Sequence, residues 1–382
     1  MIIVHVEDYF DPTAGYQINE LLFASKNFSD KVFLITSTDM TPFHKQVDMK
    51  DDIDFENETG VKIIRLKPIF KISSRLILKK FKSTIKSINP DLVFMHGIGD
   101  FKDLQLFKAK AKYKIVRDCH MSWVASKNKL RKIYFLLFKV FFARIINSNN
   151  KYEVIYALGD EELEYLLKLG IKESKIDFLK HGFNDSIIYY DENERKSKRL
   201  EYGFKDNEIV LSYIGKFNYS KRPDLIIDIL QDLNIVNQKL SILFIGSKDR
   251  DYMKFFNEKL KTVQNKFNIV IDDSKPFREL RKYYSASDIC IFPKQTTLSS
   301  IHAQICGCPV VMEKHKSNIE RVIDTENLFE ISNISEARKI LERIINNNDY
   351  LKTENLRKIK LLSNREYKNQ IEKLRMLLDS SS

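Results

Sequence analysis

Short apolar runs alternate with amphipathic segments along both halves of this 382-residue chain. The runs are rich in Val and Ile and carry few polar residues, and strands of that kind are buried on both faces, as in parallel sheets covered by helices. The pattern predicts strands at Ile2–Val6, Val32–Thr36, Val61–Leu66, Leu92–Met95, Lys114–Arg117 and Val154–Ala157 in the first half, and at Ile209–Ile214, Ser241–Ile245, Asn268–Ile271, Ile289–Phe292 and Val310–Met312 in the second.

This alternation of strands and helices predicts an α/β protein with two doubly wound, Rossmann-like domains. A chain of this length is too long for one ordinary core and suits two. We place the first domain at residues 1–188 and the second at residues 189–353, with the boundary in the polar segment Tyr189–Arg195. The tail, residues 354–382, reads as a helix that we expect to pack back on the first domain.

The net charge indicates an anionic partner. The chain has 64 Lys and Arg against 52 Asp and Glu, a formal charge of +12. Such a balance suits nucleic acid, a phosphorylated substrate or a membrane surface. The four cysteines lie in or beside apolar runs without repeated CxxC pairs, which argues against a disulfide framework or a zinc site and for a reducing compartment. We see no leader pattern at the first residues, and we expect a cytoplasmic location.

Basic residues concentrate in two blocks of the first half. The segment Lys62–Pro90 contains no acidic residue. The second block, Lys127–Arg144, joins Lys127, Lys129, Arg131, Lys132 and Lys139 with Tyr134, Phe135, Phe138, Phe141 and Phe142. A basic, aromatic, amphipathic helix predicts docking on anionic lipid, to which each basic residue contributes about 1 kcal/mol. The alternative is a core helix with a solvated lysine face. The apolar stretch Ile133–Ala143 is too short to span a bilayer.

A glycine and two lysines follow one strand of the second half. Gly215 and Lys216 come directly after the run Ile209–Ile214, and Lys221 precedes Pro223, which suits the first turn of a helix. Open α/β sheets bind ligands at this edge, where glycine allows the backbone to approach and helix N-termini attract anions. The two lysines are therefore candidates to bind a diphosphate, and the alternative is an ordinary pair of solvated lysines.

A second candidate phosphate site follows the strand Ile289–Phe292. Pro293 ends that strand, a turn rich in Thr and Ser caps a helix, and Gly307 ends the helix. A helix start of this composition suits phosphate oxygens.

Together these motifs resemble the donor-binding half of GT-B glycosyltransferases, particularly the family-four group, which use nucleotide sugars and have two Rossmann-like domains facing each other across a cleft. The resemblance covers nearly the whole chain. Its matching stretches are Asp11–Leu21, Asp91–Gly97, Lys114–His120, Ala157–Glu162, Lys180–Asn184, Gly215–Lys221, and the strand end at Phe292–Pro293 with the CGCPVV sequence at 306–311.

The resemblance implies a role for each matching residue. It assigns the donor diphosphate to Gly215, Lys216, Lys221 and the backbone N–H groups of Thr297, Leu298 and Ser299, and the nucleobase to the loop with Lys275 and Pro276. It places Gly15 under the donor sugar, His120 facing that sugar, and His96 and Tyr16 among the acceptor- or sugar-binding residues. Two ammonium groups and a helix dipole would offset the charge that develops on the leaving group, so we expect neither a metal nor another cofactor.

The sequence departs from the family pattern at two carboxylates. Most members carry Glu-(x)7-Glu, whose second Glu binds the donor ribose, whereas this chain has Lys294 and His302 at those places. Either the donor is held differently from that of other members, or it carries a negative group with which Lys294 pairs. Glu313 and Glu320 are the candidates for the ribose role.

The leading hypothesis is a glycosyltransferase that moves a sugar from a nucleotide-diphosphate donor to a growing, lipid-linked surface polysaccharide or glycolipid, with retention, at the inner face of the cell membrane. One alternative keeps the fold and is a nucleotide-sugar epimerase or hydrolase, which would turn over its substrate without an acceptor. The other is a non-catalytic basic protein that binds nucleic acid. We do not expect nucleic acid as a partner, because the aromatic residues fall in apolar runs rather than alternating with Arg on an exposed platform.

Overall fold

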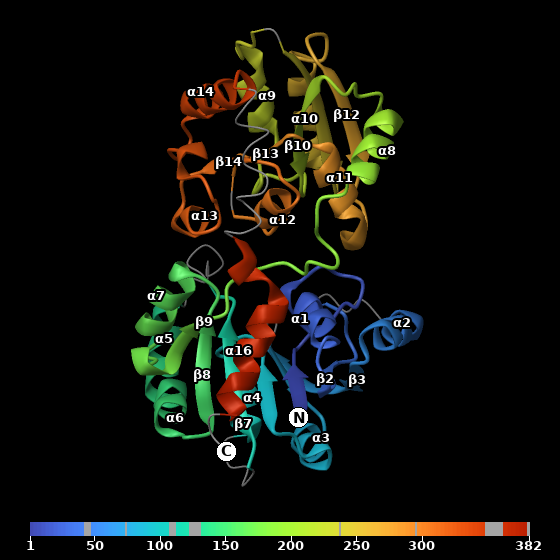
Figure 1. The fold of residues 1–382 in the computed structure, drawn as a ribbon. Helices are drawn as coiled ribbons and strands as arrows, with labels where there is room; N and C mark the ends of the chain where they lie inside the picture. Colours follow the sequence, from blue (N-terminus) through green and yellow to red (C-terminus); the bar gives the residue numbers. More distant parts are fainter. Residues whose placement is uncertain are drawn as a thin grey trace. The chain divides into compact units, whose positions relative to one another are not determined.

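The computed structural model describes residues 1–41, 47–72, 75–106, 112–121, 131–236, 238–294, 296–347 and 362–379. The chain divides into two compact units, Met1–His181 with Tyr367–Ser382, and Gly182–Glu366 (Figure 1). We predicted that the first domain ends at residue 188 and the second at residue 353. In the structure the chain enters the second unit earlier, after His181, and the second unit continues to Glu366. Each unit is an α/β structure, as predicted.

Among the described residues, the first unit contains a seven-stranded parallel sheet of order β3-β2-β1-β6-β7-β8-β9. Neighbouring residues of one strand enter different cores: Val4 and Val6 pack on one face, and Ile3 packs on the other. Both faces are thus buried, which explains why the strands are apolar throughout. Their bounds are β1 (Ile2–Val6), β2 (Lys31–Ser37), β3 (Lys62–Leu66), β6 (Leu92–Met95), β7 (Lys114–Cys119), β8 (Tyr152–Ala157) and β9 (Ile176–Phe178).

Helices cover this sheet, and one of them comes from the far end of the chain. Tyr367, Ile371 and Leu374 of the last helix enter the same core as Ile3 and Leu21, and Arg375 pairs with Asp30 at 2.9 Å. The predicted tail helix therefore belongs to the first unit from Tyr367 onward. The helices are α1 (Gln17–Ser25), α2 (Met49–Thr59), α3 (Phe81–Ile88), α4 (Lys102–Leu106), α5 (Arg131–Leu137), α6 (Ala143–Ser148), α7 (Asp160–Lys168), the 3₁₀ turn η2 (Glu173–Lys175) and α16 (Tyr367–Asp379).

Three features of the first unit are absent from the prediction, and the first is the edge strand β9. An antiparallel hairpin of β4 (Pro68–Ile72) and β5 (Arg75–Leu78) lies within the first basic block. Between α5 and α6 the helix widens into a π-helical segment, η1 (Phe138–Phe142). The hairpin and this helix are neighbours, because the Arg75 guanidinium lies 5.2 Å from the centre of the Tyr134 ring.

The second unit is built on a six-stranded parallel sheet of order β12-β11-β10-β13-β14-β15 in the described residues. Its strands are β10 (Glu208–Ile214), β11 (Lys239–Gly246), β12 (Asn268–Asp273), β13 (Ile289–Phe292), β14 (Val310–Glu313) and β15 (Leu328–Phe329). Its helices are α8 (Glu192–Tyr202), α9 (Asp224–Gln231), α10 (Arg250–Leu260), α11 (Leu280–Ala286), α12 (Ser299–Ile305), α13 (Lys316–Ile319) and α14 (Ile334–Ile345), with 3₁₀ turns η3 (Phe277–Glu279), η4 (Thr325–Asn327) and η5 (Ser363–Arg365).

All the predicted strands are present in the two sheets. Within the described part of the chain, every helix is too short or too polar to cross a membrane.

Candidate functional site

The loop after β10 brings the predicted diphosphate residues of the second unit together. Its backbone runs close to the end of β11, since a Cβ on Gly246 would lie 1.6 Å from the carbonyl oxygen of Gly215. The Tyr213 hydroxyl fixes the next residue by donating to the carbonyl oxygen of Lys216 at 2.7 Å. The Lys221 ammonium donates to the carbonyl oxygen of Thr296 at 2.7 Å. Lys221 therefore reaches the turn that leads into α12.

The electrostatics of this loop suit an anion. Burial, together with the charges of Lys216 and Arg321, lowers the pKa of Lys221 to about 8. In the part of the chain that the structure describes, no carboxylate pairs with Lys216 or Lys221. Lys216 and Arg321 therefore both repel the Lys221 ammonium, and sequence reasoning missed Arg321. A bound anion would relieve their repulsion and return the pKa of Lys221 toward its usual value.

The start of α12 lies beside Lys221. Leu298 is the N-cap residue of α12, and the Ser299 N–H donates to the Thr297 hydroxyl at a long 3.3 Å. The N–H groups of the first residues of a helix precede its internal hydrogen bonds and lie on its positive end. The predicted grouping of Thr297, Leu298 and Ser299 with Lys221 is thus present as a local arrangement.

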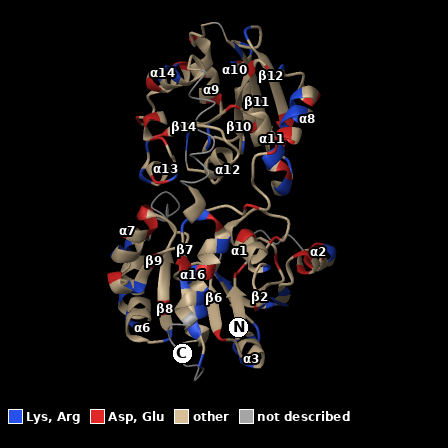
Figure 2. Ribbon diagram, in the orientation of Figure 1, with Lys and Arg blue, Asp and Glu red and all other residues tan. Residues whose placement is uncertain are grey.

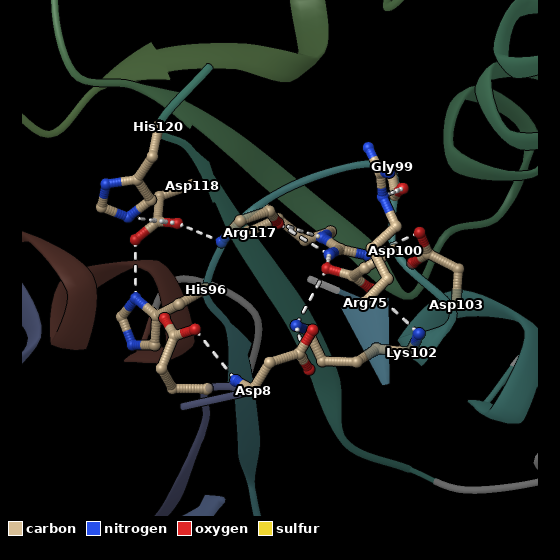
Figure 3. Close-up of polar contacts among 12 residues, drawn as sticks. Asp8, Arg75, His96, Gly99, Asp100, Lys102, Asp103, Arg117, Asp118 and His120 are labelled. Atoms are coloured by element: carbon tan, nitrogen blue, oxygen red, sulfur yellow. Dashed lines mark hydrogen bonds and ion pairs between the residues drawn. The ribbon is translucent and has the colours of Figure 1, made fainter. Parts of the chain in front are cut away.

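In the first unit, charged side chains gather where β1, β6 and β7 end (Figure 3). The fully buried Arg117 guanidinium lies 2.5 Å from a carboxylate oxygen of Asp100 and 2.5 Å from one of Asp103. Lys102 lies 2.9 Å from Asp100 and 3.1 Å from Asp8. Burial acts to raise the pKa of Asp100, but Arg117 and Lys102 lower it overall. This network fixes the loops at the edge of the sheet.

A row of histidines adjoins that network. Asp118 lies between two rings, 2.6 Å from His96 Nδ1 and 3.0 Å from His120 Nε2 (Figure 3). The His96 Nε2 atom faces His5 Nδ1 at 3.0 Å. His5, His96 and Asp118 are buried, whereas the His120 side chain is 39% exposed. His120 is therefore the member of this row that a ligand can contact.

Comparison with known proteins finds a family model that resembles part of this chain. Residues 194–360 match the family described as glycosyl transferases group 1. The match includes the Gly215–Lys221 loop and the start of α12, so the cationic cluster lies within the matched region.

Curated relatives and solved structures agree with this family. The chain is 26% identical over 160 residues to spore coat protein SA of Bacillus subtilis, covering 39% of this chain and 42% of the relative. It is 23% identical over 147 residues to D-inositol 3-phosphate glycosyltransferase of Segniliparus rotundus, covering 37% and 32%. The chain thus spans less than half the length of these relatives. Anabaena HepE, solved in complex with UDP, superposes over 100% of both chains with a TM-score of 0.75 at 15% identity. This likeness confirms the GT-B fold.

Two residues of the second unit have partners other than the ones we predicted. Lys294, a candidate partner for a negative donor group, instead lies 2.8 Å from Glu313. Glu313, expected at the ribose, is fully buried and also lies 2.7 Å from His315 Nε2 and accepts from the Ser332 N–H at 2.9 Å. Lys294 and Glu313 therefore satisfy each other, because β13 and β14 are paired neighbours that bring them together.

The segment after β12 contacts α12 through His302. Lys275 pairs with Asp272 at 2.8 Å, and Pro276 opens the turn that carries Phe277. The Phe277 ring contacts the buried His302 ring edge to face at 5.4 Å. Burial lowers the pKa of His302 to about 4, so this ring is neutral near pH 7. His302 therefore does not supply the negative charge that a Glu supplies at this position in most members of the resembling family.

The other predicted residues of the first unit, His96, Tyr16 and Gly15, lie in different environments. His96 was expected to bind acceptor or sugar, but both of its ring nitrogens face protein groups and it is 1% exposed. Tyr16 is the N-cap residue of α1 and is 61% exposed, with Gly15 before it. Sequence reasoning missed Gln17, which is 4% exposed and whose amide atoms have no hydrogen-bond partner among the described residues.

His96, Asp118 and His120 also form a group that could hold a metal ion, with ligand atoms within 4.8 Å of one another. Each oxygen of Asp118 already faces a ring nitrogen, and the Gly97 N–H donates to one of them at 2.7 Å. A metal would have to displace both histidine contacts. The arrangement therefore fits a hydrogen-bonded row better than a metal centre.

Proposed function

We propose that this protein is a glycosyltransferase that transfers a sugar from a nucleoside diphosphate donor. The observation that carries the proposal is the cationic cluster of Lys216, Lys221 and Arg321 beside the start of α12. The glycosyltransferase among the curated relatives and the UDP bound in the solved HepE structure support the same donor class. No metal enters the proposal, because the cluster itself supplies the positive charge.

The cluster suits the chemistry of the leaving group. When the glycosidic bond to the diphosphate breaks, negative charge grows on the phosphate oxygen that leaves. Cationic side chains held at that place stabilise the developing charge more than they stabilise the bound donor. We further propose retention of anomeric configuration. In support of this, burial acts to lower the pKa of His120 but Asp118 raises it to about 9, so the ring donates hydrogen bonds rather than abstracting a proton.

Nucleotide binding tests the proposal directly. We expect UDP, GDP or one of their sugar conjugates to raise the melting temperature, because a ligand that binds only the folded state stabilises it by about 2.7 kcal/mol at 100 times its Kd. The measurement is a thermal-shift panel of nucleotides and nucleotide sugars. Absence of a shift with every compound would contradict the proposal. Turnover of the matching nucleotide sugar without an acceptor would instead favour an epimerase or hydrolase.

We also propose that the acceptor is a lipid-linked glycan or glycolipid and that the first unit docks on an anionic membrane at its cytoplasmic face. The four cysteines are buried and unpaired, which suits that compartment. Figure 2 shows Lys and Arg residues in the first unit. In and around the hairpin, α3 and α5 the basic residues include Lys71 on β4, Lys79 and Lys80 before α3, Lys82 and Lys86 on α3, Lys132 on α5 and Lys139 on η1. The predicted basic residues Lys127 and Lys129 lie outside the described residues.

The exposed apolar side chains add to this proposal. Most predicted aromatic residues of the second block face inward, and Phe138 is 1% exposed. The exposed apolar residues at helical spacing are instead Ile133, Leu136, Leu137, Val140 and Phe141, joined by Ile69, Phe70 and Ile72 of the hairpin. An apolar helical face bordered by lysines is typical of a helix that lies in a membrane interface. A solvated lysine face, the alternative, does not account for these residues.

We expect the variant Leu136→Ser/Phe141→Ser to bind anionic vesicles about 100-fold or more weakly than the wild type, because it loses two apolar anchors worth on the order of 1.5–3 kcal/mol each. Co-sedimentation with phosphatidylcholine vesicles, with and without phosphatidylglycerol, measures this. The matched control is Leu200→Ser, which removes an exposed apolar residue from the second unit. Equal binding by the wild type, the double variant and the control would contradict docking through this surface. Binding that is independent of phosphatidylglycerol would also contradict it.

A further inference from the structure

Asp118 is the centre of the row of side chains at the end of β7. It is fully buried and accepts three contacts: from the Gly97 N–H at 2.7 Å, from His96 Nδ1 at 2.6 Å and from His120 Nε2 at 3.0 Å. A carboxylate held by three donors has one orientation. Burial acts to raise the pKa of Asp118, but His120 and His96 hold it well below its usual value. Asp118 is therefore a fixed anion.

The direction of the hydrogen bonds follows from that anion. An ionised carboxylate only accepts, so His96 carries a proton on Nδ1 and His120 carries one on Nε2. The His96 Nε2 atom faces His5 Nδ1 at 3.0 Å, and one of these two nitrogens donates to the other. Burial and the neighbouring His96 keep the pKa of His5 well below its usual value, so His5 is a neutral ring in this row. Both histidine contacts to Asp118 thus have an assigned donor, His96 Nδ1–H and His120 Nε2–H.

His120 is the outer member of the row and is surrounded by acidic groups. Burial acts to lower its pKa, but Asp118, with Glu7 and Glu162, raises the pKa of His120 to about 9. The ring is therefore a cation near pH 7. Its Nε2–H is committed to Asp118 and its side chain is 39% exposed. The proton left for a ligand is the one on Nδ1.

We propose that Asp118 is a positioning residue: it holds the His120 ring by Nε2–H, so that Nδ1–H is the donor offered to a hydroxyl oxygen of the bound sugar. This rests on the proposed glycosyltransferase function. When His120 loses its proton, Asp118 retains the Nε2–H, so the proton that leaves is the one on Nδ1. Deprotonation of His120 therefore removes the contact to the sugar while leaving the contact to Asp118 in place.

The state of the His120 ring can be measured without any activity. In protein labelled with ¹⁵N-histidine, we expect the wild-type His120 to titrate near pH 9 and to be the Nε2–H tautomer above that pH. In Asp118→Asn the charge is gone and the shape is kept, so the pKa of His120 should fall by about 1–3 units and the tautomer preference should be lost. An unchanged titration in Asp118→Asn, or an Nδ1–H tautomer in the wild type, would overturn the proposal.

Kinetics with the donor identified by the nucleotide panel give the second test. Asp118→Asn should lower kcat by about 10- to 100-fold with little change in donor KM, because the ring is misplaced rather than removed. Its activity should decline from a lower pH than the wild type, since the charged form of His120 is lost as pH rises through its pKa. Circular dichroism and melting temperature confirm that the variant is folded.

A double-mutant cycle separates positioning from a general structural role. If Asp118 acts through His120, the Asp118→Asn change should cost almost nothing in a His120→Ala background. Equal losses in both backgrounds would overturn the proposal. Failure of the wild type to use any nucleotide sugar would refute the proposed function, whereas the titration and tautomer of His120 would still decide the role of Asp118.

Discussion

Lys221→Ala is expected to lower kcat/KM for the nucleotide sugar by about 10²–10³-fold. Its ammonium lies at the start of α12, bonded to the Thr296 carbonyl oxygen at 2.7 Å, where a leaving diphosphate would gain charge. Affinity for the nucleoside diphosphate alone should fall by about 10- to 100-fold, the value of one charge-assisted contact of about 1.5–3 kcal/mol. Steady-state kinetics and calorimetric titration measure the two effects.

The pH dependence of nucleotide affinity gives a second test of the role of Lys221. Because burial, Lys216 and Arg321 lower the pKa of Lys221 to about 8, its charge is present below that pH and is lost as pH rises through it. Nucleotide affinity of the wild type should therefore decline above pH 8, whereas Lys221→Arg, which stays charged, should show no such decline. Lys254→Ala is the matched control, since Lys254 is exposed on α10. Wild-type affinity in Lys221→Ala would refute the assignment of Lys221.

Arg117→Ala should lower the free energy of unfolding of the first unit by about 3–5 kcal/mol. The guanidinium is fully buried and compensates Asp100 and Asp103, each at 2.5 Å. Without it, the two carboxylates remain buried with Lys102 as the nearby cation of the network. Urea denaturation followed by circular dichroism measures the loss.

Two further variants define the cause of that loss. Lys114→Ala removes a partly exposed pair with Glu153 and should cost less than about 1 kcal/mol. Arg117→Met/Asp103→Asn removes a positive and a negative charge together and should be milder than Arg117→Ala. If Arg117→Ala unfolds within about 1 kcal/mol of the wild type, the buried network does not stabilise the unit.

The strands and the diphosphate loop could be predicted because their signals are local. Val and Ile runs mark strands that are buried on both faces, and Gly215, Lys216 and Lys221 share one short segment. Asp118 and its partners could not be predicted in the same way. His5, His96 and Asp118 come from separate strands and meet only through the pairing of β1 with β6 and of β6 with β7.

The same limit explains why the pairing of Lys294 with Glu313 could not be predicted from the sequence. Lys294 and Glu313 look available as isolated residues of a sequence. They meet because Phe292 on β13 is in register with Met312 on β14, which places the following residues side by side. A charged residue can be predicted to bind a ligand only if no residue of opposite charge on the neighbouring strand pairs with it.

The return of α16 to the first unit has a consequence for how the protein is made. The core face containing Ile3 and Leu21 is completed by Tyr367, Ile371 and Leu374. All of the second unit is synthesised before those residues, so the first unit still exposes an apolar surface when translation of the second unit ends. The amino-terminal unit is therefore the last to be finished, and a stop codon shortly before residue 367 would leave it open.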